Sequence, residues 1–326
     1  MTAPGPKLML PGTKLAVSPL CLGGNRFGGE LDEAASFALL DAFAERGGNF
    51  IDTAHVYADW IPGNAPSSSE RMIGRWLADR RPHGVVVATK GGHPPLDDPS
   101  TKRLDAGSLR ADVEGSLACL GLPALDLFYL HRDDPGRPAA DILLALERLR
   151  SEGLIRHYAA SNWSTARLRE ARAAARAEGW AGFVASQVEW SLATRNSGTA
   201  ATDLVAMDRG MMDFHESTGW AAVPYSAQAK GYFDKASGVL DPATARAYDN
   251  ARNRDTTALL GAIAARHGAT PTQVMLAAFR RLPFPVVPVI GPRTPEQIEG
   301  SWAALSLDLD ADDAGRLWRL ARERVA

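Results

Sequence analysis

Short apolar segments alternate with amphipathic segments along the whole chain. Eight apolar runs can be counted, at residues 19–24, 49–54, 85–90, 125–130, 155–161, 183–190, 221–227 and 286–291. Most of them are continuous rather than alternating, which is typical of strands covered on both faces. Between them lie helix-like segments, so each strand–helix unit spans about 30 to 40 residues. This alternation predicts a parallel sheet with right-handed crossovers.

Helix starts can be predicted at several of the intervening segments. Asp32 opens the segment 32–48, which ends on a glycine pair. Ser67 and Glu70 have the spacing of a capping box at the start of segment 67–80. Two further segments begin with a threonine, a proline and, three residues after the threonine, a glutamine, at 270–273 and 294–297. We expect the threonines to cap these helices.

Eight strand–helix units favour a closed (β/α)₈ TIM barrel within the α/β class. The competing fold is an open doubly wound sheet, but no GxGxxG motif follows any predicted strand. The stretch "KLMLPGTKLAV" (7–17) predicts an N-terminal β-hairpin, and residues 308–326 predict an extra C-terminal helix. A Gly/Ala/Asp-rich loop is expected over about 228–255. Because no linker interrupts the pattern, we interpret residues 1–326 as one domain.

Composition narrows the possible partners and the compartment. The net charge of −2 argues against a nucleic-acid surface or an anionic membrane as partner. Two cysteines, Cys21 and Cys119, lie in apolar stretches and are too few for a disulfide framework. The N-terminus lacks the apolar run of a signal peptide, and no stretch approaches membrane-spanning length. We therefore expect a soluble cytoplasmic protein.

Polar residues stand at the carboxyl ends of several predicted strands. Side chains alternate along a strand, so Asp52, Lys90, His131, Gln187 and Tyr225 each end an apolar row that faces one side. In a barrel these ends meet at one face, where chemistry is found. The pattern predicts that these side chains lie at one level of the barrel.

Each of these residues also has a structural explanation. Asp52 and Lys90 can form a buried salt bridge, and a lone His131 can be a core histidine. Tyr57, just beyond the second predicted strand, can cap the barrel mouth. Their joint occurrence at the ends of three consecutive strands favours the catalytic interpretation.

The residue types suit proton transfer to a carbonyl oxygen. A phenol has a pKa near 10 and can donate a proton at neutral pH. A lysine ammonium at about 4 Å, with an effective dielectric constant of about 20, favours the phenolate by roughly 4 kcal/mol. Lys90 is therefore expected to bring the pKa of Tyr57 toward the working pH, while Asp52 keeps Lys90 charged. His131 can orient a substrate carbonyl by a hydrogen bond.

Seven motifs, in order, resemble those of the aldo-keto reductases: "NFIDTAHVY", "VVVATKGG", "LDLFYLHRDD", "AASNWS", "SQVEWS", "PYSAQAKG" and "VIGPRTPEQIEGS". The resemblance runs from about residue 15 to residue 305. It implies a (β/α)₈ barrel that binds NADP(H) and transfers hydride to an aldehyde or ketone. It also implies that Asp52, Tyr57, Lys90 and His131 are the catalytic residues, with Tyr57 as the proton donor.

The same resemblance implies a set of cofactor-binding residues. Ser161, Asn162 and Gln187 match positions that hold the nicotinamide carboxamide, and Tyr225 matches the aromatic residue that stacks on the ring. The remaining matches lie on the pyrophosphate loop and in the last motif: Ser226, Gln228, Lys230, Gly291, Arg293 and Gln297. Arg293 matches a residue that contacts the 2′-phosphate, so NADPH is expected over NADH. Its position before a helix N-terminus suits an anion, although a surface charge is the alternative.

The chain departs from the family pattern at three places. Ser301 replaces an asparagine near the adenine, and Trp190 replaces a tyrosine. The segment 58–70 is longer than usual and is expected to reshape the pocket mouth.

Substrate-pocket candidates follow from position on the strand-end loops. They are Trp60, Arg132, Trp163 and Tyr232, with Phe233 beside the last; packing of the loops against one another is the alternative. They suggest a sugar, a sugar-like ketone or an aromatic aldehyde. No metal motif is present, and His83, His93 and His267 are interpreted as exposed polar residues. A second hypothesis is a cofactor-binding regulatory subunit of the same fold with little turnover.

Overall fold

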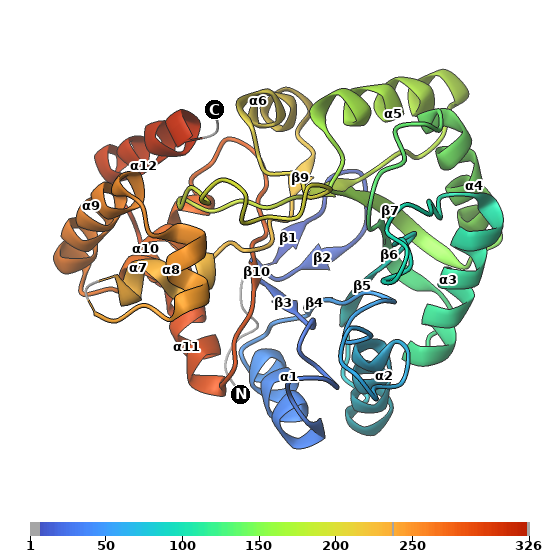
Figure 1. Ribbon diagram of the computed structural model, residues 1–326, viewed down its shortest axis with the longest axis horizontal. Helices are drawn as coiled ribbons and strands as arrows, with labels where there is room; N and C mark the ends of the chain where they lie inside the picture. The colour runs from blue at the N-terminus through green and yellow to red at the C-terminus, as the bar shows by residue number, and fades with distance from the viewer. Residues whose placement is uncertain (1–6, 237, 325–326) are drawn as a thin grey trace.

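The computed structural model describes residues 7–236 and 238–324. Its main sheet has eight parallel strands in the order β10-β3-β4-β5-β6-β7-β8-β9, surrounded by helices (Figure 1). The strands are β3 (Cys21–Gly23), β4 (Phe50–Asp52), β5 (Val86–Gly91), β6 (Leu125–Leu130), β7 (Ile155–Ser161), β8 (Ala185–Gln187), β9 (Ala221–Ala222) and β10 (Val289–Ile290). Each coincides with one of the eight predicted apolar runs, and only β5 extends beyond its run, by Gly91.

The sheet closes on itself between β9 and the stretch before β10. Ala222 N donates to Pro285 O at 2.9 Å, and Val287 N donates to Ala222 O at 2.9 Å. Val289 N reaches Pro224 O, also at 2.9 Å. An open doubly wound sheet would leave both edge strands unpaired, so the predicted (β/α)₈ barrel is confirmed.

The helices follow the strands in the expected alternation. They are α1 (Glu33–Glu45), α2 (Ser68–Arg80), α3 (Ala106–Leu120), α4 (Ala139–Ser151), α5 (Thr165–Glu178), α6 (Arg209–Thr218), α10 (Pro271–Phe279) and α11 (Pro295–Ala303). The expected loop after β9 instead contains η1 (Ala229–Gly231), α7 (Tyr232–Lys235) and α8 (Pro242–Tyr248), followed by α9 (Ala251–His267). The extra C-terminal helix is confirmed as α12 (Ala311–Arg324), reached through η2 (Ala304–Ser306).

The N-terminal hairpin packs against the inside of the barrel. Strands β1 (Leu8–Met9) and β2 (Ala16–Val17) pair antiparallel, as predicted. Leu10 and Val17 join the same apolar cluster as Phe50, from the start of β4. The hairpin therefore seals the end of the barrel opposite the carboxyl ends of the strands.

Strand parity separates two apolar layers. Phe50, Ala88 and Leu127 belong to the cluster inside the barrel, whereas their sequence neighbours Ile51, Val87 and Phe128 pack outward against helices. The same alternation predicts that Phe183, Ala185 and Gln187 share the inward face, and this prediction fails at Phe183. Phe183 packs outward, against Tyr158 and Trp163, and Val184 faces inward instead. The reason is that Gly182 adopts a left-handed φ of 73° and β8 begins only at Ala185.

Helix starts agree with the sequence pattern at some positions and not at others. Asp32 accepts a hydrogen bond from Ala35 N, and Thr270 with Gln273 forms the predicted capping box. The predicted capping box at Ser67 is wrong, because Ser67 has a φ of 58° and makes no side-chain cap. Thr294 also makes no side-chain cap. Glu70, the other member of the expected box at α2, is fully buried and has different partners, described below.

Candidate active site

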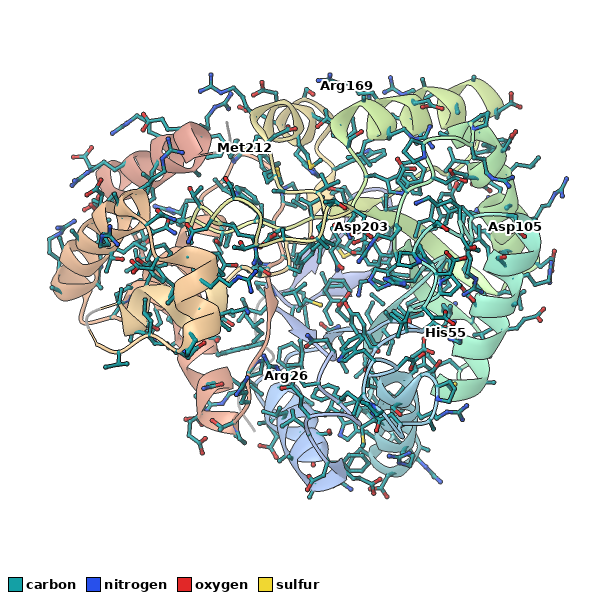
Figure 2. The ribbon with its side chains drawn as sticks, in the orientation of Figure 1. Arg26, His55, Asp105, Arg169, Asp203 and Met212 are labelled. Atoms are coloured by element: carbon teal, nitrogen blue, oxygen red, sulfur yellow. The ribbon has the colours of Figure 1, made fainter. Side chains whose placement is uncertain are left out.

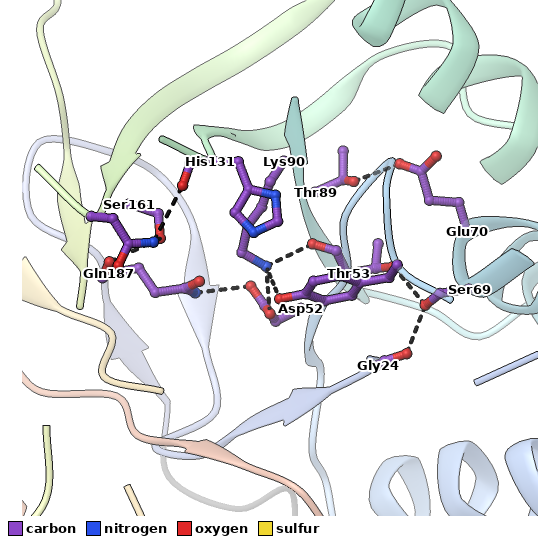
Figure 3. Close-up of polar contacts among 12 residues, drawn as sticks. Gly24, Asp52, Thr53, Ser69, Glu70, Thr89, Lys90, His131, Ser161 and Gln187 are labelled. Atoms are coloured by element: carbon purple, nitrogen blue, oxygen red, sulfur yellow. Dashed lines mark hydrogen bonds and ion pairs between the residues drawn. The ribbon is translucent and has the colours of Figure 1, made fainter. Parts of the chain in front are cut away.

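Lys90 lies at the centre of a buried polar cluster at the carboxyl ends of β4 and β5. Its Nζ donates to Asp52 Oδ2 at 2.7 Å, to Thr53 O at 2.8 Å and to the Tyr57 hydroxyl at 3.0 Å (Figure 3). The side chains of Lys90 and Asp52 are 1% and 4% exposed. An ammonium group has three protons, and these three acceptors account for all of them.

Strand register and one tight turn bring these residues together. Asp52 pairs with Ala88 across β4 and β5, which places Lys90 one inward-facing position further along the neighbouring strand. After β4, His55 N donates to Lys90 O at 2.9 Å, and Tyr57 N donates to Ala54 O at 3.0 Å. The turn thus directs Tyr57 back over the lysine.

Burial and charge act in opposite directions on the two proton-carrying groups. Burial disfavours the ammonium of Lys90, but the adjacent Asp52 and Tyr57 outweigh it, and the pKa of Lys90 is raised. Burial also raises the pKa of the Tyr57 phenol, and Lys90 opposes this rise without cancelling it. The expectation that the lysine lowers the pKa of Tyr57 toward neutrality is therefore wrong for the structure as it stands. Tyr57 keeps its proton at neutral pH.

His131 stands beside the phenol at the end of β6. The two rings meet edge to face with centroids 5.7 Å apart. Burial, reinforced by the nearby charges of Arg132 and Lys90, lowers the pKa of His131 well below its usual value. The imidazole is therefore neutral at pH 7, and its buried Nδ1 has no hydrogen-bond partner among the described residues.

Outside the barrel, α2 holds the strand ends that carry Asp52 and Lys90. Ser69 donates to Gly24 O at 2.7 Å and accepts from the Thr53 hydroxyl at 2.7 Å (Figure 3). Glu70 accepts from the Thr89 hydroxyl at 2.5 Å. Each threonine directly neighbours a residue of the central cluster in sequence.

These α2 contacts were not among the interactions expected from the sequence. A signal was present, because Thr53 and Thr89 are hydroxyl residues on the outward face of buried strands, where a polar group needs a partner. A buried partner on the following helix could have been expected from that alone.

A chain of hydrogen bonds links the cluster to the residues matched to nicotinamide binding. Gln187 Nε2 donates to Asp52 Oδ1 at 2.9 Å, and the Ser161 hydroxyl donates to Gln187 O at 2.9 Å. Asn162, with a left-handed φ of 59°, donates to His131 O at 3.2 Å and accepts from the Tyr225 hydroxyl at 2.8 Å. The structure therefore brings these four residues together beside the catalytic candidates.

The loop after β9 has an unusual backbone. Ser226, Ala229 and Lys230 have φ values of 55°, 46° and 56°, all left-handed, and Gly231 follows at 73°. Such conformations cost free energy and concentrate at functional sites, and they can turn backbone N–H groups toward an anion. Lys230 is exposed at this loop.

The segment after β10 lies beside this loop. Gln228 Nε2 donates to the Ser301 hydroxyl at 3.0 Å, and Gly291 N donates to Gln228 Oε1 at 3.4 Å. Arg293 stands before α11 with its side chain 65% exposed and 3.9 Å from Glu30. Gln297, also exposed, accepts from Arg293 N at 2.7 Å.

A model of the aldo/keto reductase family matches residues 19–322. The chain belongs to the aldo/keto reductase family. It is 29% identical to an aryl-alcohol dehydrogenase of Pestalotiopsis microspora, over 94% of this chain and 79% of that protein. A norsolorinic acid reductase of Emericella nidulans is 29% identical, with the same two coverages. An uncharacterized oxidoreductase of Bacillus subtilis, YrpG, is 30% identical over 92% of this chain and 91% of its own length.

The fold is also that of a solved family member. The thermostable aldo-keto reductase Tm1743, crystallised with the inhibitor epalrestat, superposes with a TM-score of 0.71 at 22% identity. The match covers 96% of this chain and 99% of that one. At this identity the likeness concerns the fold.

Two of the substrate-pocket candidates of this aldo/keto reductase lie near the phenol. Trp60 is 48% exposed and meets the Tyr57 ring edge to face at 6.0 Å. Arg132 donates to Asp203 at 2.6 Å and to His131 O at 2.9 Å. Figure 2 shows Asp203 near the centre of the barrel face, in the segment between β8 and α6.

The other two candidates are placed elsewhere. Trp163 and Tyr232 are each 0% exposed within the core of this aldo/keto reductase, and Phe233 is 2% exposed. Trp163 packs on Phe183, and its indole N–H donates to Arg132 O at 3.3 Å. They pack loops and helices against one another, which corrects the expectation that they line an open pocket.

Two histidines interpreted as exposed are partly buried in this aldo/keto reductase. His93 packs its ring on His131 with centroids 4.8 Å apart, and burial lowers its pKa. His267 lies 3.7 Å from Asp313, whereas His83 is exposed as expected. Within residues 7–236 and 238–324, no helix combines the length and apolar character that crossing a bilayer requires.

Proposed function

We propose that this chain is an NADPH-dependent reductase of small-molecule aldehydes and ketones, with Tyr57 as the general acid. The observation that carries the proposal is the Tyr57 hydroxyl 3.0 Å from the Lys90 ammonium, beside the ring of a neutral His131. A protonated phenol, a fixed cation and a neutral imidazole are the groups that protonation of a carbonyl oxygen requires.

Each residue has a separate task in this reaction. Tyr57 gives its proton to the substrate oxygen, and the Lys90 cation stabilises the phenolate left behind. Asp52 holds Lys90 charged and in place through the 2.7 Å contact. His131, neutral because its pKa is depressed, donates a hydrogen bond to the same oxygen and orients it. The nicotinamide, when bound, supplies the hydride to the carbonyl carbon.

The residues around the cluster fit a dinucleotide. Ser161, Asn162 and Gln187 present amide and hydroxyl groups suited to a carboxamide, and Tyr225 presents an aromatic ring beside them. The left-handed loop around Ser226, Gln228 and Lys230 suits a pyrophosphate.

The preference for NADPH over NADH rests on α11. Arg293 is an exposed guanidinium before the N-terminus of that helix, and both the charge and the helix end favour a phosphate. Gly291 and Gln297 lie beside it and complete the cofactor-binding residues we propose.

The names of the relatives guide the choice of substrate. By name, one relative acts on aryl alcohols and several others act on norsolorinic acid. Trp60 offers an exposed aromatic surface at the phenol, and Arg132 adds a polar group. We therefore place aromatic aldehydes and ketones first and sugars or sugar-like ketones second. The free thiols Cys21 and Cys119 suit a reducing compartment, which supports a cytoplasmic location.

A substrate panel tests the proposal. The protein is mixed with NADPH, or separately with NADH, and with aromatic aldehydes, aliphatic ketones and reducing sugars, and cofactor oxidation is followed. We expect turnover of at least one aromatic carbonyl and a higher kcat/KM with NADPH. Tight NADPH binding without turnover across the panel would instead favour the regulatory, cofactor-binding subunit. Equal efficiency with NADH would remove Arg293 from the site.

A further inference from the structure

A cavity of about 300 Å³ lies next to the proposed catalytic centre. Its walls come from the turn after β4, from the segment after β5, and from α3 with the stretch before it; they include His55, Val56, Asp59, His93, Leu96 and Asp112. The size is at the lower end of the range for small-molecule pockets. A cavity of this size can accept about one aromatic ring system. The residue roles proposed above do not include this cavity.

His93 is the wall shared by this cavity and the catalytic centre. Its ring lines the cavity and also meets the His131 ring at 4.8 Å and 64°. His131 in turn meets Tyr57 at 5.7 Å. His131 therefore contacts both the phenol and His93, and a substrate that joins the Tyr57 hydroxyl to His93 extends past one imidazole ring.

The hydrogen bonding of His93 fixes which of its nitrogens is free. Nδ1 lies 2.6 Å from Pro94 O, and a carbonyl oxygen only accepts, so Nδ1 carries the proton. Burial lowers the pKa of the ring, so Nε2 is unprotonated at neutral pH. No described residue hydrogen-bonds Nε2, and it is not among the sealed, unpartnered atoms. His93 therefore presents an open acceptor.

The remaining walls select against anions and favour a flat, partly apolar group. Arg103 is paired with Asp112 at 2.5 Å, and Asp112 also accepts from Gly92 N, so this cation is already neutralised. Asp59 adds a second carboxylate. Val56, Leu96 and two prolines, Pro94 and Pro95, supply the apolar surface.

We propose that this cavity is a subsite for a hydroxylated aromatic ring of the substrate, whose phenolic O–H donates to Nε2 of His93. The inference rests on the proposed carbonyl reduction and adds a substrate class to it. Phenolic aryl aldehydes and ketones fit, because they combine a hydrogen-bond donor with a flat apolar body. Polyols offer donors without the apolar body, and carboxylates meet two aspartates.

Two aldehydes that differ by one hydroxyl test the subsite. The wild-type protein with NADPH is compared on 2-naphthaldehyde and 6-hydroxy-2-naphthaldehyde. We expect kcat/KM to be about tenfold higher for the hydroxylated compound, since an open acceptor rewards a matching donor. His93→Phe keeps a ring against His131 and removes the acceptor, so the ratio should fall to about one. Because the ratio is taken within each variant, a general change in turnover cancels.

The control is the same substitution at the exposed His83, which should leave the ratio at its wild-type value. Binding can also be measured without turnover, by following the quenching of 2-naphthol fluorescence as the compound binds to the complex of the protein with NADP⁺. The affinity obtained in this way should be about tenfold weaker in His93→Phe. An unchanged ratio and unchanged quenching in His93→Phe would overturn the subsite. The subsite would also be overturned if neither naphthaldehyde were reduced while small aldehydes were, or while reducing sugars were reduced in a way that depended on His93. Failure of every carbonyl on the panel would instead overturn the proposed function.

Discussion

The β4–β6 side of the barrel mouth and the β9–β10 side are built from different kinds of contact. On the first side, Asp52 and Lys90 are buried, and each is hydrogen-bonded to its neighbours. On the second side, Lys230, Arg293 and Gln297 are exposed, and the backbone near Lys230 is held in left-handed conformations. On the first side the Lys90 ammonium finds all three of its hydrogen-bond acceptors within the protein, whereas the second side offers exposed groups that a ligand would engage.

This difference separates proton transfer from cofactor selection. Groups that stabilise charge in a transition state act best when their positions are fixed before reaction. Groups that recognise a phosphate can stay hydrated until it arrives, because exposed charges cost little to keep. Substitutions on the β4–β6 side should therefore change kcat, and those on the β9–β10 side should change cofactor affinity.

The strongest test of this division is Tyr57→Phe. The change removes one proton donor and almost no volume, so we expect kcat to fall by about 10³-fold, within the usual range for a general acid. NADPH titration, followed by protein fluorescence, should give an affinity within about twofold of wild type, since the lost hydroxyl contacts Lys90. Carbonyl reduction at the native rate would mean that another residue donates the proton.

Arg293→Gln tests the β9–β10 side. Loss of one charged hydrogen-bond donor to a phosphate should raise the KM for NADPH about 10- to 100-fold and the KM for NADH less than about twofold. Arg46→Gln is a matched control, because Arg46 is an exposed arginine paired with Glu299 on the same helix, α11. An equal loss with both cofactors would show that Arg293 supports the fold rather than the 2′-phosphate.

Residues whose position follows from periodicity were predictable from the sequence. The inward placement of Asp52, Lys90 and His131 follows from alternation along strands that start and end with clear apolar runs. Glu70 was not predictable in this way. Its spacing to Ser67 fits a local capping box, but its actual partner, Thr89, lies 19 residues away and competes successfully for the carboxylate. Local patterns do not contain such long-range partners.

The burial of individual side chains was also not predictable from the sequence. Trp163, on the loop after β7, and Tyr232, the first residue of α7, were expected to line an open pocket, yet both are completely buried, because large rings fill the space between barrel and helices. The pKa of Tyr57 depends on the same quantity, since its desolvation outweighs the attraction of Lys90. His93 was likewise expected at the surface, whereas in the structure it lines a cavity.

Thr89→Val tests whether α2, through Glu70, helps to hold Lys90 in place on the β4–β6 side. The change removes the 2.5 Å hydrogen bond to a buried carboxylate, so we expect kcat to fall about five- to tenfold as Lys90 loses its fixed position. Thr89→Ser keeps the hydroxyl and should restore most of kcat.

Thr256→Val is the control for a buried threonine elsewhere. Thr256 is 1% exposed on α9 and donates to Arg252 O at 3.0 Å. The substitution Thr256→Val should lower the free energy of unfolding by about 1 kcal/mol, as Thr89→Val should, while leaving kcat unchanged. Equal kcat values for Thr89→Val and wild type would limit Glu70 to stability.

The smallest expected effect concerns pH and the outer contacts of the turn that carries Tyr57. His55 Nδ1 lies 3.3 Å from Glu70, and this hydrogen bond raises the pKa of His55 above its usual 6.5, with Asp112 and Asp59 adding to the rise. A raised folded-state pKa stabilises the protein fully below the unfolded pKa, and this contribution is lost as pH rises through the folded value. The free energy of unfolding should therefore decline above about pH 6.5 in the wild type.

His55→Gln should flatten this decline, measured by urea unfolding between about pH 5.5 and pH 8.5, and His83→Gln should leave it intact. The backbone of residue 55 donates to Lys90 O at 2.9 Å and accepts from the Ser67 hydroxyl at 2.8 Å, whatever the charge on the imidazole. Because these two contacts hold the turn in both protonation states, kcat should not follow the His55 titration. If kcat did follow it in the wild type and not in His55→Gln, the fixed geometry of the β4–β6 side would depend on the charge outside the barrel as well as on the bonds within it.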